Sequence, residues 1–136
     1  MKLDHIGIAV RSIEASRKFY EAGLKLHAFP DIEIVAGERV RVLKLDVEPG
    51  LHLELLEAMD EESAIAKFIA KRGEGMHHVC YSVPDVRAAT CELLKQGFKP
   101  IWNEPHAGAG GCQVNFFHPK ETFGVLTELS QPPSRA

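Results

Sequence analysis

The sequence is poor in cysteine, in long apolar runs and in net charge, and each shortage excludes a class of protein. Its three cysteines, Cys80, Cys91 and Cys112, are an odd number without CxxC spacing, which argues against a disulfide framework or a cysteine-based zinc site. No apolar run approaches the roughly 18–20 residues of a membrane helix. The net charge of −3 argues against a nucleic-acid partner held by electrostatics.

The remaining bulk properties are those of a soluble globular protein. Of the 136 residues, 45% are hydrophobic and 26% are charged, which suffices for one domain with its own core. The first residues enter a strand pattern directly, without the apolar segment of a signal peptide. We therefore expect a single cytoplasmic domain over residues 1–136, with neither a membrane nor a nucleic-acid partner.

What the sequence does contain is an internal repeat. Residues 4–10 (DHIGIAV) return as residues 77–83 (HHVCYSV), so that His5 matches His78 at a spacing of 73. Leu-Glu-Leu at 53–55 returns as Thr-Glu-Leu at 127–129, so that Glu54 matches Glu128 at a spacing of 74. If the two halves pack about a pseudo-twofold axis, two histidines and two glutamates converge on one point, which predicts a metal site.

Each copy of the repeat predicts a strand, a helix and then further strands. The expected helices span Ser12 to Gly23, Asp60–Ser63 to Gly73, and Asp85 to about Gln96. The expected strands lie near 3–10, 25–29, 32–36, 39–46, 51–57, 76–83, 98–103, 112–118 and 123–130. This pattern predicts an α+β fold with two tandem βαβββ modules, at about 1–58 and 74–131, and a connecting helix at about 60–73. Their curved mixed sheets would surround a shared metal cleft.

Strand alternation selects which histidines and glutamates face that cleft. His5 and His78 lie opposite the aliphatic residues of their strands, whereas His77 points toward the packed side. Glu54 and Glu128 are also opposite the apolar residues that flank them. An acidic residue in an apolar strand is costly unless it is paired or bound to a cation. Two imidazoles and two carboxylates suit a divalent ion such as Co²⁺, Mn²⁺, Ni²⁺, Fe²⁺ or Zn²⁺. The alternative is that the histidines are structural residues of the sheet with their hydrogen bonds made there, and that the glutamates face solvent.

Over residues 2–131 these stretches resemble the vicinal oxygen chelate superfamily, the glyoxalase and bleomycin-resistance type of fold. The more specific stretches resemble the methylmalonyl-CoA epimerases within it. They are SAIAKFI at 63–69, GEGMHH at 73–78, GAGG at 108–111, FHPK at 117–120 and GVLTEL at 124–129.

The resemblance implies that His5, Glu54, His78 and Glu128 hold a divalent metal ion, Co²⁺ or else Mn²⁺, Ni²⁺ or Zn²⁺. It implies epimerisation of methylmalonyl-CoA, or a close 2-substituted malonyl-CoA, by 1,1-proton transfer through a metal-stabilised enolate. We expect Glu128 to act as one catalytic base, with Glu54 as its pseudo-symmetric counterpart. In at least one member of the family a further glutamate is proposed as a base, and its place falls near Arg41, with Glu38 nearby. The partners implied are an acyl-CoA substrate and a second copy of the chain, in a homodimer.

Several residues of the second half are candidates for substrate binding. The backbone at Gly110 and Gly111 is expected to approach the thioester or the CoA arm, although a flexible hairpin turn is an equal alternative. The remaining candidates are Gln113, Asn115, His118 and Lys120. The alternative for Gln113 and Asn115 is a polar strand edge, and the alternative for His118 and Lys120 is a plain turn between strands. His27, His52 and His106 have no repeat partner, so we expect them in surface or loop positions.

Two other functions remain open at this stage. A lyase of the glyoxalase I type would use the same kinds of metal ligand on a hemithioacetal of glutathione. A metal-free binding or sequestering module would instead use the cleft hydrophobically and would need no matched set of four ligands.

Overall fold

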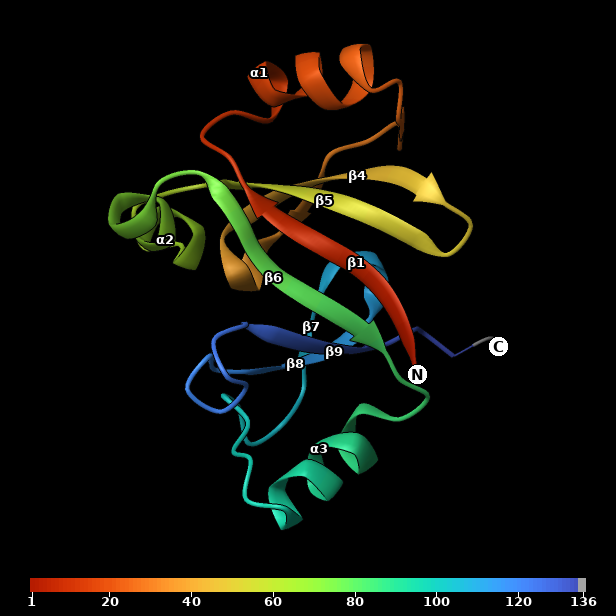
Figure 1. The fold of residues 1–136 in the computed structure, drawn as a ribbon, viewed down its shortest axis with the longest axis vertical. Coiled ribbons are helices and arrows are strands. Elements are labelled where there is room, and N and C mark those ends of the chain that lie inside the picture. The colour runs from red at the N-terminus through yellow and green to blue at the C-terminus, as the bar shows by residue number, and fades with distance from the viewer. Residues whose placement is uncertain (135–136) are drawn as a thin grey trace. The chain divides into compact units, whose positions relative to one another are not determined.

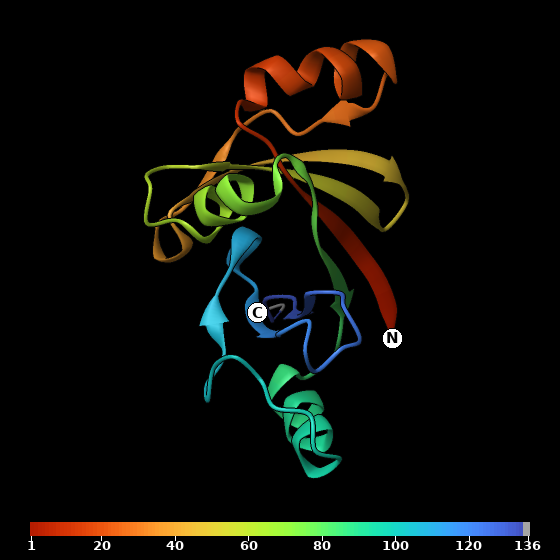
Figure 2. The same cartoon turned by 60° about the vertical axis from the view of Figure 1, so that its left-hand side comes forward.

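The computed structural model describes residues 1–134, which form two compact units (Figure 1). The first unit comprises residues 5–77, and the second unit comprises residues 1–4 together with the chain from His78 onward. The predicted α+β class is confirmed, since each unit combines a mixed sheet with helices (Figure 2). The boundaries of the single domain expected over 1–136 stay a prediction. Among the described residues, no helix is both long enough and apolar enough to cross a membrane.

The first unit is built around β5, which pairs in parallel with β1 and antiparallel with β4. Short strands β2 and β3 add to the other edge of β4. Its elements are β1 (Lys2–Ala9, within this unit from His5), α1 (Ile13–Arg17), η1 (Lys18–Gly23), β2 (His27–Ala28), β3 (Glu33–Val35), η2 (Ala36–Glu38), β4 (Val40–Glu48), β5 (Leu51–Ala58) and α2 (Ala64–Arg72). Ser12 begins α1 as predicted, because its side chain accepts a hydrogen bond from the Ala15 amide. The helix then continues to Gly23 as a π-helical turn.

The second unit repeats this strand order. Its elements are β6 (Gly75–Ser82, within this unit from His78), α3 (Val86–Lys95), β7 (His106–Ala107), η3 (Ala109–Gly111), β8 (Gln113–Phe117) and β9 (Thr127–Gln131). Strand β9 pairs in parallel with β6 and antiparallel with β8, as β5 does with β1 and β4. Asp85 caps α3 by accepting a hydrogen bond from the Ala88 amide. The two units therefore share one strand topology, which corresponds to the repeat seen in the sequence.

One of the predicted strands is absent, and another begins later than predicted. The segment near 98–103 is not a strand, and the short strand β7 follows it at His106–Ala107. Pro100 has no amide hydrogen for a ladder, and only the Ile101 amide bonds to the carbonyl of Phe116 in β8. The strand expected from residue 123 begins only at Thr127, because a turn closed by the hydrogen bond from the Gly124 amide to the Pro119 carbonyl precedes it.

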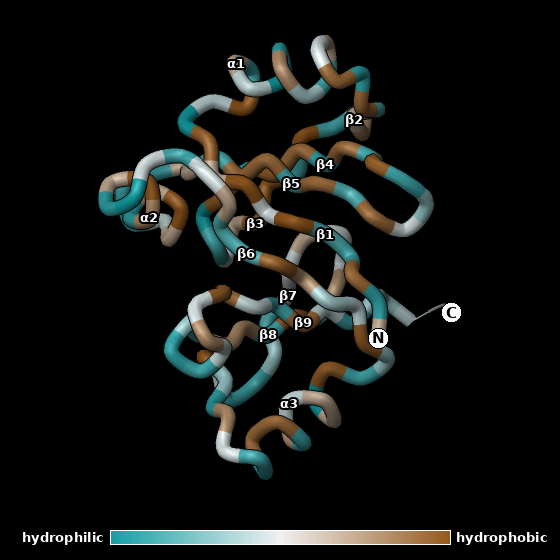
Figure 3. Tube along the Cα trace, viewed as in Figure 1, coloured by the Kyte–Doolittle hydropathy of each residue, from teal (hydrophilic) through white to brown (hydrophobic). Residues whose placement is uncertain are grey.

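The apolar core of each unit lies on one face of its sheet. In the first unit, Leu43, Leu45 and Leu55 pack with Val10 and with Ile13 of α1. In the second unit, the corresponding cluster is Val83, Val86, Phe117 and Leu129, with Val86 coming from α3. Figure 3 shows the apolar stretches along the central strands. Because successive side chains of a strand point to opposite faces, the residues that alternate with these leucines face away from the helix, and the candidate site lies there.

Candidate metal centre

In the first unit, His5 and Glu54 form a buried pair on the face opposite the core. Strands β1 and β5 are in register so that Gly7 lies beside Glu54 and His5 lies beside His52. Glycine has no side chain to fill the space beside Glu54. The carboxylate Oε2 of Glu54 lies 3.5 Å from Nδ1 of His5, and both side chains are less than 10% exposed. The predicted partnership of this histidine and this glutamate is present within one unit.

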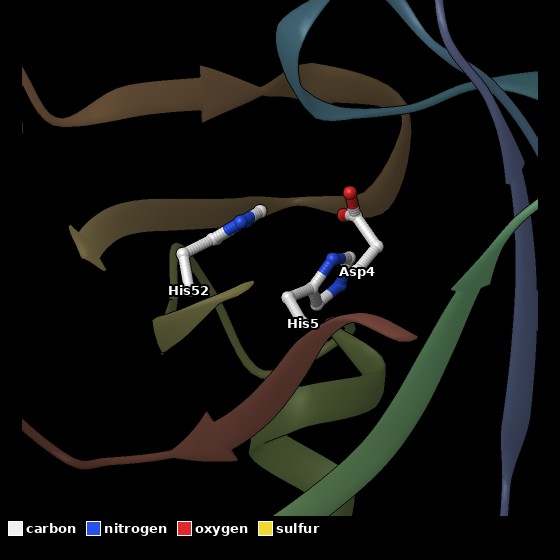
Figure 4. A group of neighbouring side chains, drawn as sticks. All are labelled: Asp4, His5 and His52. Carbon is white, nitrogen blue, oxygen red and sulfur yellow. The ribbon is translucent and has the colours of Figure 1, made fainter. Parts of the chain in front are cut away.

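A third residue, His52, joins this pair on β5, whereas the sequence predicted a surface or loop position for it. Its Nε2 lies 3.0 Å from Oε2 of Glu54, and its ring centroid lies 4.9 Å from that of His5. Figure 4 shows the His5 and His52 side chains, together with Asp4, which precedes His5 in the chain. The signal that was missed is the spacing of two between His52 and Glu54, which places both side chains on one face of a strand.

In the second unit, His78 and Glu128 form the equivalent buried pair. Nε2 of His78 lies 3.1 Å from Oε1 of Glu128, and both side chains are again less than 10% exposed. Cys80 lies beside Glu128 in the register of β6 and β9, at the place that Gly7 holds beside Glu54. The Cys80 side chain is fully buried.

The preceding residue, His77, turns to the other face of β6, as alternation predicted. Within the first unit its ring meets Phe68 of α2 edge to face, at a centroid distance of 5.0 Å. Neighbouring histidines in the sequence therefore have different surroundings, and only His78 lies beside a buried carboxylate.

Aromatic rings extend from His78 across the second unit. The Phe116 ring meets His78 edge to face at 5.6 Å and meets Trp102 edge to face at the same centroid distance. Trp102 in turn stacks on His106 at 3.8 Å with an interplanar angle of 8°. His106, expected in a surface or loop position, is exposed, and it lies in short strand β7.

Arg41 of β4 stands at the place expected for a further basic glutamate, and Glu38 lies nearby at the end of η2. Arg41 cannot serve as a base, and its guanidinium lies 4.0 Å from the Glu57 carboxylate. In the register of β4 and β5, Arg41 lies beside Glu57, while Lys44 lies beside Glu54 and shares its face. The Lys44 ammonium lies 5.9 Å from the centre of the Phe29 ring. Lys44 is therefore the ionisable side chain that β4 presents next to Glu54.

The glycine loop before β8 is a tight turn with accessible backbone. Gly110 and Gly111 have φ of 68° and 74°, a left-handed conformation that favours glycine, and both are exposed. At Gly108, an added Cβ would lie 2.8 Å from the Val114 side chain, so the backbone approaches β8 closely there.

The His118–Lys120 turn lies at the other end of β8. The ring Nδ1 of His118 accepts a hydrogen bond from the Lys120 amide, and both residues are exposed. Five residues of strand separate this turn from the glycine loop, a span of about 16 Å at the usual rise. These predicted substrate-binding residues therefore do not form one cluster, and only an elongated ligand could touch both loops.

Asn115 is fully buried and is hydrogen-bonded to backbone. Its amide nitrogen donates to the Trp102 carbonyl at 3.0 Å, and its Oδ1 accepts from the amides of Trp102 and Phe116. In register it lies beside Leu129, on the face opposite Glu128, and Gln113 shares that alternation. Substrate binding by these two residues stays a prediction, and the register argues against it.

We expect Asn115→Ala to lower the free energy of unfolding by about 2–4 kcal/mol, because the backbone amide and the carbonyl of Trp102 both lose their hydrogen-bond partner. Chemical denaturation measures the loss. Gln113→Ala, at an exposed position of the same strand, is the control and should change stability by less than about 0.5 kcal/mol. Equal stability of the two variants would show that the Asn115 contacts do not hold this segment.

The donor atoms of each pair suit a divalent metal ion. Each pair consists of one imidazole and one carboxylate, and Glu54 and Glu128 are only 5% and 6% exposed. Such buried carboxylates need a hydrogen bond or a cation. Nitrogen and oxygen donors without thiolate are typical of catalytic sites for Co²⁺, Mn²⁺, Ni²⁺ or Zn²⁺ rather than of closed structural zinc sites.

The sequence and the fold match those of a known superfamily. A model of the glyoxalase/bleomycin resistance protein/dioxygenase superfamily matches residues 4–116. The chain belongs to this superfamily, as the sequence indicated.

Within the superfamily, the chain is similar to methylmalonyl-CoA epimerases. An ethylmalonyl-CoA/methylmalonyl-CoA epimerase of Cereibacter sphaeroides is 38% identical over 134 residues, covering 96% of this chain and 97% of that protein. A variant of Streptomyces coelicolor methylmalonyl-CoA epimerase in complex with 2-nitronate-propionyl-CoA has a TM-score of 0.91 and 36% identity, covering 98% of this chain and 99% of the other. A methylmalonyl-CoA epimerase in complex with methylmalonyl-CoA and NH4+ has a TM-score of 0.90 and 36% identity, covering 98% and 95%. The resemblance stated from the sequence is confirmed.

Proposed function

We propose that the chain is a metal-dependent epimerase of methylmalonyl-CoA, or of a close 2-substituted malonyl-CoA. The observation that carries the proposal is the buried histidine–glutamate pair that recurs in each unit at equivalent strand positions. The similarity to epimerases supports the substrate class, because one such relative is in complex with methylmalonyl-CoA.

His5, Glu54, His78 and Glu128 are the residues that would hold the ion. A divalent ion there would supply a Lewis acid that stabilises the negative charge developing on the thioester oxygen during deprotonation. Co²⁺ is the first ion to test, followed by Mn²⁺, Ni²⁺ and Zn²⁺.

Proton transfer is the task of the chain's own carboxylates. In the proposed reaction Glu128 takes the proton from the α-carbon, and the C–H electrons move toward the thioester carbonyl. A proton is then returned to the opposite face of that carbon, with Glu54 as the pseudo-symmetric counterpart of Glu128. A positioned acid or base of this kind typically contributes about 10²–10⁴ in rate.

The loops at the two ends of β8 are the proposed contacts for an acyl-CoA. Gly110 and Gly111 lie in an exposed turn with left-handed backbone, and His118 and Lys120 bring polar and charged side chains. Lys120→Ala is expected to raise KM with little change in kcat, and an unchanged KM would remove this contact.

We also propose that the protein is a cytoplasmic homodimer. Light scattering of the purified protein tests the assembly, and cell fractionation tests the location.

The test of the reaction uses metal-stripped protein and the same protein refilled with Co²⁺, mixed with one epimer of methylmalonyl-CoA in D₂O. We expect the refilled protein alone to exchange the α-proton for deuterium while the opposite epimer forms. Proton NMR follows the exchange, and chiral analysis follows the epimer.

The other outcomes separate the alternatives. Bound metal without exchange would contradict the epimerase, and activity on methylglyoxal with glutathione would then identify a lyase of the glyoxalase I type. A wild-type protein that takes up none of the four ions would contradict both enzymes and favour a metal-free binding module.

A further inference from the structure

The first unit contains an imidazole that the second unit lacks. His52 precedes Glu54 by two residues on β5, and the repeat spacing of 74 places Leu126 at the equivalent position before Glu128. The structure agrees, because Leu126 lies next to β6 through a hydrogen bond from the Val79 amide to its carbonyl. The two glutamates therefore differ in their neighbours on their own strands.

The contacts of Glu54 show what this extra imidazole does. Oε2 of Glu54 lies 3.0 Å from Nε2 of His52 and 3.5 Å from Nδ1 of His5. Because an ionised carboxylate oxygen only accepts hydrogen bonds, His52 carries its proton on Nε2 and donates it. Within the described residues, Oε1 of Glu54 has no hydrogen bond, so one oxygen is held and the other is left for a ligand.

His52 is itself held in place. In register it lies between His5 on β1 and Asp46 on β4, and its ring is close to the Phe29 ring at 6.5 Å. Its side chain is only 16% exposed. A donor with restricted rotation fixes the orientation of the carboxylate that it contacts, as outer partners of metal ligands commonly do.

We propose that His52 is a positioning residue that fixes Glu54 as the immobile carboxylate of the metal centre. The proposal rests on the proposed function. It narrows the proposed roles of the two glutamates, because Glu54 then serves as a metal ligand throughout turnover and Glu128 removes the α-proton. The proton returned to the opposite face then comes from an acid other than Glu54.

The test compares His52→Leu with His52→Gln, in which the amide nitrogen takes the place of Nε2 and keeps the donor. Affinity for Co²⁺ is measured by competition with a chelator, and the visible spectrum of the bound Co²⁺ is recorded. We expect His52→Leu to weaken Co²⁺ binding by about 10–100-fold. His52→Gln should stay close to the wild type in affinity and spectrum.

Activity at saturating Co²⁺ provides a second readout. Since His52 acts on the ligand and not on the proton, His52→Leu should regain most of its kcat when excess Co²⁺ refills the site. The control is His27→Leu, which removes an exposed histidine of the same unit whose ring contacts Asp46, and which should match the wild type throughout.

Each result decides the question. Wild-type affinity and spectrum in His52→Leu would overturn the positioning role while leaving the epimerase intact. An equal loss of affinity in His52→Gln and His52→Leu would also overturn it, because His52 would then be a metal ligand itself. A wild-type protein that binds no Co²⁺ but binds another of the four ions moves the same comparison to that ion, and one that binds none overturns the proposed function together with this inference.

Discussion

Replacing Glu128 with glutamine is expected to lower the rate of epimerisation by about 10²–10⁴. Glutamine preserves the size of the side chain and an oxygen ligand, but it cannot accept a proton from the α-carbon. The loss should therefore appear in kcat and in deuterium exchange, while the content of bound metal changes little. Single-turnover exchange and elemental analysis of the same sample measure both quantities.

Two control variants show whether this effect belongs to Glu128. Glu92→Gln changes an exposed carboxylate on α3 of the same unit and should leave the rate unchanged. Glu54→Gln should reduce the rate less than Glu128→Gln does, because an amide oxygen still accepts the hydrogen bond from His52. Full activity in a metal-loaded Glu128→Gln variant would remove Glu128 as the base.

Removing the His78 imidazole is expected to produce the largest loss of metal. A partner that only orients a ligand is worth about 10–100-fold in affinity, so a ligand itself should be worth more than about 100-fold. We expect His78→Ala to bind Co²⁺ at least that much more weakly and to lose its metal-dependent activity. Chelator competition and proton exchange in D₂O measure the two effects.

The adjacent residue is the matched control for this variant. His77→Ala removes the same group one position away in the same strand, but that ring packs on Phe68 and lies on the opposite face. It should cost some stability and leave Co²⁺ affinity close to the wild type. Equal losses of affinity in His77→Ala and His78→Ala would contradict the assignment of the two faces.

Alternation along a strand explains why most of the site could be predicted from the sequence. It separates His78 from His77, and it places Glu54 opposite Leu53 and Leu55, as the observed register and core confirm. These predictions depend only on the two-residue period of a strand and on a duplicated pattern. Both properties are local, and both are visible in one sequence.

The requirement for a repeat partner also caused the main error. His52 was assigned to the surface because Leu126 stands at its repeat position, yet it contacts Glu54 directly. A duplicated pattern identifies the residues that the two halves share, but it gives no signal for a functional residue present in only one half. The spacing between His52 and Glu54 carried the correct information on its own.

The segment near 98–103 could not be predicted from local pattern. Its apolar residues favour a strand, but Pro100 removes one ladder hydrogen bond, and the peptide of Trp102 bonds to the side chain of Asn115 instead of to a neighbouring backbone. An asparagine side chain that imitates a strand pairing depends on a tertiary contact, which strand propensity does not describe.

The row of rings from His78 to Trp102 has a practical consequence, because the chain contains one tryptophan. Its indole stacks on His106 and is separated from the His78 ring by a single phenyl group, that of Phe116. Emission excited selectively at tryptophan therefore originates beside a side chain of the proposed metal centre. The fluorescence of Trp102 can therefore follow metal or ligand binding at this site without an attached dye.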